Sequence, residues 1–292
     1  MRRDRFAHGA AVAGERGLVA REFPFSEREF ERARKLIHRL AGIAMSDLKQ
    51  DMVYGRLVRC LRAKGLKSFD QYLDLVESGR AAEREAFINA LTTNLTSFFR
   101  EPHHFPILAD HARKRPAHEP FRVWCAASST GEEPYSIAIT LAEALPTTRR
   151  VEILASDIDT QVLATAQQGE YPLVRLNAMS AERRSRFFIT GAGVPAGMAR
   201  VKPELTERIR FSKINLLDPT WSVRGPLDVI FCRNVMIYFD KPTQRKLLER
   251  FKPMLRPDGL LICGHSESFQ HHADLFRNLG HTVYTPAGPV RT

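Results

Sequence analysis

The spacing of apolar residues divides the chain into two parts with different predicted secondary structure. Between residues 23 and 91, apolar side chains recur every three or four positions, as they do along helices with one buried face. The first such stretch opens with Ser26 and Glu29, which have the spacing of a capping box, and Gly42 follows it as a stop signal. Similar stretches run from about Ser46 to Gly65, from Ser68 to Glu77 and from Glu83 to Leu91. The pattern therefore predicts a compact all-helical unit over residues 23–91.

From residue 121 onward, short apolar runs alternate with stretches of helical pattern. The runs are rich in β-branched, aromatic and aliphatic residues and cover 121–127, 151–157, 208–217, 226–234 and 260–266. Helical patterns lie between them at about 134–145, from 161 onward and at 241–255. Near-continuous apolar strands that alternate with helices are typical of a mostly parallel sheet with both faces covered. We therefore expect an α/β fold with a Rossmann-like sheet over residues 121–292.

Three further segments complete the predicted domain organisation. Residues 1–22 are rich in arginine, alanine and glycine without clear periodicity, and we expect them to form a mobile arm. Residues 92–120 are interpreted as a linker between the helical unit and the sheet. Residues 187–210 combine glycines with short β-like pieces, which predicts a small inserted β-subdomain, and a long irregular loop is the alternative.

The composition is that of a globular chain with an excess of positive charge. Hydrophobic residues make up 43% of the 292 residues and charged residues 26%, values that exclude a collagen and a chain disordered throughout. No apolar run reaches the roughly 18 residues that a membrane-spanning helix needs, and no signal-peptide core is apparent, so we expect a cytoplasmic protein. The first third of the chain carries more than its share of the net charge of +11. Nucleic acid, an anionic membrane surface, an acidic protein or simply a well-solvated face can each account for this charge.

The cysteines and histidines give no sign of a metal centre. Cys60, Cys125, Cys232 and Cys263 lie far apart, and no Cys or His pair has zinc-binding spacing. The last three cysteines stand in apolar runs, which predicts buried thiols. The adjacent pairs His103-His104 and His271-His272 do not face one site on a helix. We therefore expect no bound metal.

Candidate chemistry follows the first two predicted strands, where ligands bind in open α/β sheets. Small residues at 127–131 let a ligand approach the backbone, and Glu132 and Glu133 then open a helix. No lysine follows Gly131, so this is not a P-loop, and the two carboxylates would repel a phosphate. Asp157 ends the second run, where an acidic side chain accepts hydrogen bonds from ribose hydroxyls in dinucleotide-binding folds. A role for Asp157 as a helix-capping or loop carboxylate is the alternative.

Polar residues also follow the third and fourth runs. Asn215 and Leu216 offer an amide and a backbone donor that can bind the edge of a heterocycle. Arg233 and Asn234 stand between apolar residues, a setting in which a charge needs a partner or a ligand; a structural Arg–Asp pair is the alternative. An adenosyl ligand without phosphate, held by acidic side chains, indicates S-adenosylmethionine, because its sulfonium and amino groups are positively charged.

Six segments occur together in the order and spacing of one known family. They are LTTNLTSFFREPHHF (91–105), WCAASSTGEEPYSIA (124–138), ASDIDT (155–160), INLL (214–217), FCRNVMIYFD (231–240) and LRPDGLLICGHSES (255–268). From about residue 23 to 287, the chain thereby resembles the CheR-type chemoreceptor glutamate methyltransferases. The resemblance implies a small all-α N-terminal domain followed by a Rossmann-like S-adenosylmethionine-dependent methyltransferase domain that carries a small inserted β-subdomain.

The resemblance also implies roles for individual residues. It places Asn94, Thr96 and Arg100 over the cofactor, Glu132 and Asp157 on its methionine amino group and ribose, Asn215 and Leu216 near the adenine, and Arg233 and Asn234 beside the cofactor. Tyr238 would line the substrate side, and Arg100 is a candidate to orient the reacting carboxylate. The implied products are a glutamyl methyl ester and S-adenosylhomocysteine.

The implied partner is the cytoplasmic helical domain of membrane chemoreceptors. Arg56, Arg59 and Arg62 recur every three residues along one predicted helix, and we hypothesise that this basic stripe binds the acidic substrate helix. Whether the β-subdomain also binds a peptide at the receptor C-terminus is left open.

Two other functions share parts of this pattern. A nucleic-acid methyltransferase would suit the net charge, but the chain contains no [DN]PP[YF] motif and no Pro-Cys nucleophile. A non-enzymatic module that only binds S-adenosylmethionine is the other reading. We expect neither nucleic acid as a partner nor insertion into a membrane.

Overall fold

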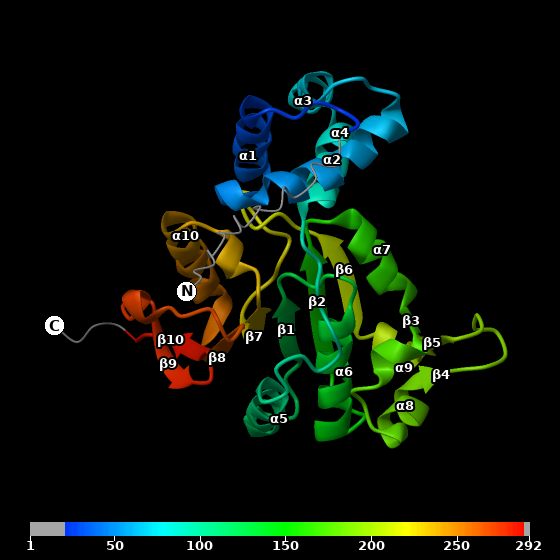
Figure 1. The fold of residues 1–292 in the computed structure, drawn as a ribbon. Coiled ribbons are helices and arrows are strands. Elements are labelled where there is room, and N and C mark those ends of the chain that lie inside the picture. The colour runs from blue at the N-terminus through cyan, green and yellow to red at the C-terminus, as the bar shows by residue number, and fades with distance from the viewer. Residues whose placement is uncertain (1–20, 289–292) are drawn as a thin grey trace, which may run out of the picture.

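A computed structural model describes residues 21–288 and places a helical domain above an α/β domain (Figure 1). The predicted mobile arm, 1–22, therefore lies almost wholly outside the described residues. The helical domain contains α1 (Glu27–Ala41), η1 (Asp47–Lys49), α2 (Gln50–Lys64), α3 (Phe69–Glu77) and α4 (Ala81–Leu91). The predicted all-helical unit is confirmed.

The ends of these helices follow from local sequence. At the start of α1, the Ser26 side chain accepts from the backbone N–H of Glu29 and the Glu29 carboxylate accepts from that of Ser26, which confirms the capping box. Gly42 and Gly65 end α1 and α2 with positive φ angles of 72° and 65°, a conformation that glycine adopts without strain. The helices share one buried apolar core that includes Phe30, Leu57, Phe69, Tyr72 and Phe87.

A seven-stranded sheet forms the centre of the α/β domain, in the order β6-β2-β1-β7-β8-β10-β9. Its strands are β1 (Phe121–Cys125), β2 (Val151–Asp157), β6 (Ile209–Lys213), β7 (Leu227–Cys232), β8 (Leu255–Cys263), β9 (Phe276–Gly280) and β10 (Val283–Pro286). The five predicted strands pair in parallel, whereas β9 and β10 form an antiparallel hairpin at one edge. The strand order reverses between β1 and β7, and ligands bind at such a reversal in open α/β sheets.

Helices cover both faces of this sheet, which explains the near-continuous apolar strands. Side chains of α5 (His104–Lys114) and α6 (Glu132–Ala144) pack with Val123 and Cys125 on one face. Side chains of α10 (Lys241–Phe251) pack with Trp124 on the other. A further helix, α7 (Thr160–Gln168), follows β2. Helix α5 lies within residues 92–120, the segment that we expected to be a linker. Only the first part of that segment, before α5, spans the domains as an extended chain.

A separate three-stranded antiparallel sheet, in the order β3-β5-β4, forms the small inserted β-subdomain. Its strands are β3 (Glu170–Pro172), β4 (Phe188–Ile189) and β5 (Met198–Val201). Between β3 and β4 lie η2 (Leu173–Leu176) and α8 (Ala181–Phe187), and α9 (Pro203–Thr206) leads from β5 to β6 of the main sheet. The prediction of 187–210 missed β3, because three strand residues directly after a helix leave no recognisable alternation. The segment forms a sheet rather than the irregular loop that was the alternative.

The expectation of buried thiols also has a structural counterpart. Cys125, Cys232 and Cys263 are buried and free, and burial raises the pKa of each thiol. None of the described helices has the length and apolar character needed to cross a membrane.

Candidate functional site

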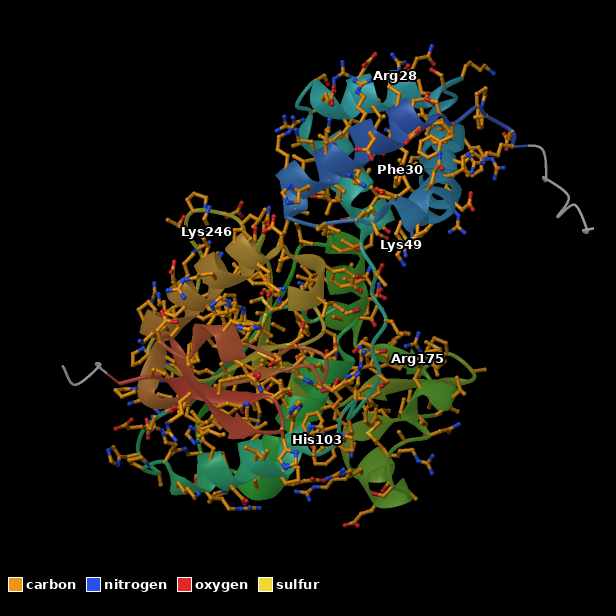
Figure 2. The ribbon with its side chains drawn as sticks, turned by 60° about the vertical axis from the view of Figure 1, so that its left-hand side comes forward. Arg28, Phe30, Lys49, His103, Arg175 and Lys246 are labelled. Carbon is orange, nitrogen blue, oxygen red and sulfur yellow. The ribbon has the colours of Figure 1, made fainter. Side chains whose placement is uncertain are left out.

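A cavity of about 440 Å³ lies where the helical domain meets the carboxyl ends of β1, β2 and β7. The helical domain contributes the loop after α1 and the start of α2, and the linker after α4 contributes residues 92–96. Lys49, at the edge of the helical domain nearest the α/β domain, is one of the lining residues (Figure 2). The volume lies within the roughly 300–1,000 Å³ of small-molecule sites in proteins.

The loop after β1 forms one wall and depends on a glycine. Gly131 has a φ angle of 98°, and a Cβ atom there would lie 2.6 Å from the Tyr171 hydroxyl oxygen and 2.8 Å from Ala166 Cβ. A side chain at residue 131 is therefore excluded by both backbone conformation and space. Ser129, which lines the cavity, donates a hydrogen bond from its hydroxyl to the backbone oxygen of Asn94 at 2.9 Å. This bond holds the linker against the loop.

Asp157, at the end of β2, is a buried carboxyl group in the cavity wall. It accepts from the backbone N–H groups of Ser129 at 2.8 Å and Asp159 at 3.0 Å. Burial nevertheless raises its pKa to about 6, because these two bonds only partly compensate for the lost water. Ile158 and Ile214 give the same part of the cavity an apolar surface.

Asn215 and Leu216 lie at the junction of the two domains. The Asn215 side chain donates to the backbone oxygen of Leu40, in α1, at 2.8 Å, and accepts from the backbone N–H of Leu217 at 3.0 Å. Leu216 is buried, and both residues line the cavity. The end of the third predicted strand therefore connects the helical domain to the sheet as well as shaping the site.

Arg233 is a buried arginine with acidic partners from two segments. It donates to Glu133 Oε2 at 2.8 Å and to the backbone oxygen of Arg100 at 2.6 Å, and its Nη2 lies 3.3 Å from Glu101 Oε2. Its partners are glutamates of other segments, so the Arg–Asp pair that was the alternative is not what holds it. Arg233 fixes the linker to the end of β7, beside the cavity that it also lines.

Asn234 follows with a positive φ angle of 56°. Its backbone N–H donates to Glu267 at 2.9 Å and its side-chain amide donates to Glu101 at 3.3 Å. Gly264 lies so close that a Cβ atom there would be 2.3 Å from Asn234 Nδ2. The glycine therefore keeps the space that this asparagine occupies.

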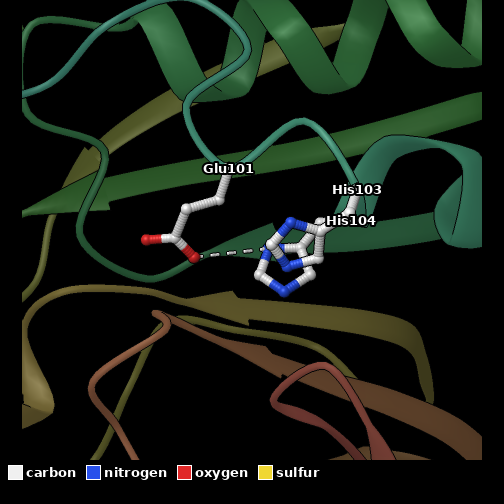
Figure 3. Close-up of side chains that lie close together, drawn as sticks. All are labelled: Glu101, His103 and His104. Carbon is white, nitrogen blue, oxygen red and sulfur yellow. Dashed lines mark ion pairs between the residues drawn. The ribbon is translucent and has the colours of Figure 1, made fainter.

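Glu101 lies next to His103 and His104, and potential metal-ligand atoms of the three residues lie within 4.8 Å of one another (Figure 3). Burial lowers the pKa of His104 to about 4, so this imidazole is neutral near pH 7. Burial alone would raise the pKa of Glu101, but hydrogen bonds from His265 and Asn234 and the charge of Arg233 together lower it to about 2. The positive charge of the nearby Arg233 guanidinium disfavours a metal ion at this cluster. We therefore assign Glu101 the role of holding Arg233 and Asn234.

The linker residues Asn94, Thr96 and Arg100 all line the cavity, as does Tyr238. The Asn94 amide donates to Asp159 at 2.7 Å, and the Arg100 guanidinium donates to the backbone oxygen of Leu95 at 3.0 Å. The backbone oxygen of Tyr238 accepts from Ala44 of the helical domain at 2.7 Å. The structure thus brings nine of the predicted residues together: Asn94, Thr96, Arg100, Asp157, Asn215, Leu216, Arg233, Asn234 and Tyr238.

Glu132 is placed differently from its neighbour Glu133. Glu132 is 1% exposed and does not belong to the cavity lining; its carboxylate accepts from Thr130 at 2.6 Å and from Arg175 at 3.0 Å. Glu133 is the glutamate that lines the cavity. The binding of the methionine amino group by Glu132 stays a prediction, and Glu133 joins it as a second candidate.

The three arginines of the predicted stripe lie outside the cavity and have different surroundings. Arg56 donates to the backbone oxygens of Leu91 and Thr92 at 2.9 and 2.6 Å, so it holds the end of α4. Arg62 pairs with Glu22, and Arg59 is exposed. Arg56 is therefore occupied within the chain, whereas Arg59 and Arg62 remain at the surface.

Sequence reasoning missed the contribution of the helical domain to the site. Met45, Ser46, Lys49 and Met52 line the cavity, yet helical periodicity distinguishes only buried from exposed positions. Glu133 could have been named as a site candidate from the sequence, because it stands in the same motif as Glu132. Which of the two glutamates faces the cavity depends on the rotation of α6.

The lining residues fit S-adenosylmethionine. Asp157 can accept from ribose hydroxyls, the apolar side chains of Ile158, Ile214 and Leu216 suit a flat heterocycle, and Glu133 lies where a positive amino or sulfonium group would be stabilised. Within residues 21–288, no glycine-rich loop with a lysine, of the kind that would favour a phosphate, lines the cavity.

Family models and curated relatives agree with this geometry. Residues 28–92 match the all-alpha domain of CheR methyltransferases, and residues 94–285 match their SAM-binding domain. Chemotaxis protein methyltransferase 2 of Pseudomonas aeruginosa is 54% identical over 268 residues, which are 91% of this chain and 95% of that protein. The chemotaxis protein methyltransferase of Salmonella typhimurium is 54% identical over 91% of this chain and 92% of its own length.

A third relative extends the same comparison. The chemotaxis protein methyltransferase of Escherichia coli is 53% identical over 261 residues, which cover 89% of this chain and 91% of that protein. The first matched model covers the all-α domain of the structure, and the second covers the α/β domain with the seven-stranded sheet. The chain therefore belongs to the CheR methyltransferase family, and its α/β domain is an S-adenosylmethionine-binding methyltransferase domain.

Proposed function

We propose that this protein methylates glutamate side chains of membrane chemoreceptors in chemotaxis. The observation that carries the proposal is the cavity shared by two domains, in which the Asp157 carboxyl group is buried, Glu133 is paired with the buried Arg233, and Lys49 is exposed to solvent. The curated relatives are named chemotaxis protein methyltransferases, which supports the same pathway. The partner would be the helical cytoplasmic domain of a chemoreceptor, and the reaction would take place in the cytoplasm.

The proposed cofactor contacts are those of the sequence motifs and one addition. Asn94, Thr96, Arg100, Asp157, Asn215, Leu216, Arg233 and Asn234 would surround the cofactor, with Glu132 or Glu133 near its amino group. Asp157 would hold the ribose and Leu216 would lie against the adenine. When bound, S-adenosylmethionine supplies a methyl group that ends on a glutamate oxygen as a methyl ester, with S-adenosylhomocysteine as the other product.

The residues of the chain position the acceptor rather than activate it. A glutamate side chain has a reference pKa near 4.3, so it is ionised at neutral pH and needs no general base. Arg100 would orient this carboxylate, and Tyr238 would line its path. The two domains together shield the reacting groups from water, and alignment of bound partners contributes up to about 7–11 kcal/mol in such reactions.

Substrate docking would involve the exposed basic side chains of α2. Arg59 is exposed and would contact an acidic helix, Arg62 would have to exchange its exposed pair with Glu22 for the substrate, and Arg56 would act indirectly by holding the linker. Binding of a receptor C-terminal peptide to the small β-subdomain would add a second contact.

A transfer assay tests the function. Protein and S-adenosylmethionine labelled on the methyl group are incubated with a chemoreceptor cytoplasmic fragment, and we expect label that alkali releases as methanol, as an ester requires. Asp157→Ala should abolish the transfer and weaken S-adenosylhomocysteine binding in calorimetry. Asp110→Ala, which removes an exposed carboxylate paired with Arg113 on α5, should change neither measurement.

The same assay, run also with DNA or RNA as the acceptor, distinguishes the alternatives. Alkali-stable label in DNA or RNA, with none in the receptor fragment, would replace the proposal by nucleic-acid methylation. Tight binding of S-adenosylhomocysteine without transfer to any acceptor would indicate a binding module.

A further inference from the structure

Exposed aliphatic side chains from two separate parts of the chain line the cavity, and a third directly precedes a lining residue. Leu48 lies in η1 of the helical domain, Leu95 in the linker and Ile237 in η3 (Met236–Tyr238) of the α/β domain. They are 93%, 79% and 49% exposed. Leu95 and Ile237 line the cavity, and Lys49, which follows Leu48, lines it too. These three aliphatic residues are called the apolar rim below.

Exposed large apolar side chains are concentrated in the apolar rim rather than spread evenly over the described surface. Among residues 21–288, six large apolar side chains are highly exposed, and half of them form the apolar rim. The others are Leu173 and Val174 of the β-subdomain and Leu279 of β9. A single exposed leucine is ordinary, but exposed aliphatic groups from separate segments in the lining of one cavity and next to it are typical of a binding surface.

Cations accompany the apolar rim, while the carboxylates lie deeper. Lys49 is exposed, and Arg100 is half-buried with its guanidinium on the backbone oxygen of Leu95. Asp157 is buried, and Glu133 is paired with the buried Arg233. A carboxylate that arrives from solvent therefore meets positive charge first, with apolar surface on either side of it.

We propose that the apolar rim selects the substrate helix by contacting apolar side chains one turn before and one turn after the glutamate that is methylated. Residues three and four positions apart lie on one face of a helix, so these neighbours accompany the glutamate toward the mouth. Lys49 attracts the carboxylate, and the rim distinguishes a glutamate with apolar neighbours from one within a fully charged helix face. The inference rests on the proposed function, because it takes a helical glutamate as the acceptor.

The test compares rim variants with a matched control on the full-length protein. Leu48→Ser, Leu95→Ser and Ile237→Ser are made singly and together, and Leu279→Ser removes an equally apolar, 47% exposed side chain far from the cavity. With a chemoreceptor cytoplasmic fragment as substrate, we expect the triple variant to raise KM about tenfold, as loss of an apolar binding patch does. Leu48 does not line the cavity, so Leu48→Ser should raise KM while its affinity for S-adenosylhomocysteine stays within about twofold of wild type, and the control should match wild type in both measurements.

A second set of substrates identifies what the rim contacts. In receptor fragments, the apolar residues one turn on either side of a methylated glutamate are replaced by serine. Wild-type protein should lose affinity for these fragments, whereas the triple variant, which lacks the contact already, should show little further loss. Equal losses in both proteins, or an unchanged KM in the triple variant, would overturn the proposal. If wild-type protein transfers no methyl group to the unaltered fragment, the proposed function itself fails.

Discussion

The Asp157 carboxyl group shows how one residue sets the conditions for ligand binding. Burial raises its pKa to about 6 even though two backbone N–H groups donate to it. A carboxylate accepts more hydrogen bonds than a protonated carboxyl group, so ligand hydroxyls and a proton compete for this side chain.

We predict that affinity for S-adenosylhomocysteine falls as the pH falls through about 6. The ligand prefers the deprotonated form of Asp157, which prevails above that pH, so acidification removes the binding form and affinity is regained on raising the pH. Calorimetric titrations between about pH 8 and pH 5 measure the effect. Asp157→Asn should bind weakly with a flat pH profile; the same slope in this variant would assign the titration to another group.

Gly264 provides a second prediction at the scale of single residues. A Cβ atom at this position would lie 2.3 Å from Asn234 Nδ2 and 2.9 Å from Asn234 N, so Gly264→Ala must displace Asn234, which we propose to lie beside the cofactor. Overpacking of this kind costs about 1–3 kcal/mol of folding free energy, and S-adenosylhomocysteine affinity should fall with it. Chemical denaturation and calorimetry measure the two effects. Gly55→Ala on α2, where a Cβ meets nothing within 4 Å, is the control and should lose neither stability nor affinity.

Among the elements, the β-subdomain and the linker are joined by a hydrogen bond from Arg175 as well as by aromatic packing of Phe98 on Tyr171 and Phe188. Arg175 of η2 donates to the Glu132 carboxylate at 3.0 Å and to the backbone oxygen of Thr96 at 3.3 Å. Glu132 is almost fully buried while Arg175 is half exposed, so the pair is only partly shielded from solvent screening. The contact nevertheless ties the position of Thr96, which lines the cavity, to a separate small sheet.

Arg175→Ala should therefore weaken S-adenosylhomocysteine binding by about three- to tenfold, because the linker over the cavity loses its support. Arg175→Lys should recover part of the affinity, since a lysine ammonium can still reach the carboxylate. Arg200→Ala breaks an ion pair with Glu170 inside the same small sheet and is the control. Equal affinities of all three variants would show that the linker holds its position without the β-subdomain.

Arg56 yields the corresponding prediction for the end of α4. Arg56→Ala removes donors to two backbone oxygens at the C-terminus of that helix and should lower the free energy of unfolding by about 1–3 kcal/mol. Arg59→Ala, at an exposed position of the same helix, should change it by less than about 0.5 kcal/mol. Urea denaturation measures both. If Arg56→Ala leaves the free energy of unfolding unchanged, Arg56 becomes again a candidate for direct substrate contact.

The elements also show which parts of the structure the sequence could predict. Parallel strands bring their carboxyl ends to one edge, so Asp157, Asn215 and Arg233 could be assigned to one site from the apolar runs before them. Strand β9 could not be found, because it is exposed along most of its length and carries no apolar run. Helix α5 was hidden in a segment that short motifs marked as a linker.

At the scale of the whole molecule, the two domains share the cavity and several polar contacts. Leu40 and Ala44 of the helical domain bond to Asn215 and Tyr238, and the Thr92 hydroxyl donates to Asp159 at 2.7 Å. Composition and periodicity predict each of the two domains separately. How the domains pack against each other depends on long-range contacts, which neither composition nor periodicity reveals. The net charge of +11 likewise left an anionic partner and a well-solvated face as alternatives, and it located no binding surface.

We predict that S-adenosylhomocysteine protects both domains from amide hydrogen exchange. Ligand that contacts residues 43–49 and the strand ends together stabilises the arrangement in which they face one another, and exchange through its opening slows as a result. Mass spectrometry of digested, exchange-labelled protein should show slower exchange in the loop after α1 as well as in the loops after β1 and β7. Protection confined to the α/β domain would contradict a cavity with two-domain walls.

The walls drawn from two domains limit how this protein can be rearranged. A Rossmann-like sheet is often treated as a self-sufficient cofactor module, but here the loop after α1 and residues 92–96 complete the enclosure. Exchanging the helical domain for that of a distant relative would alter cofactor retention together with target choice. Cofactor retention and target choice are therefore expected to change together. A chimera intended to act on a new target has to preserve the contacts made by Leu40, Ala44 and Asn94.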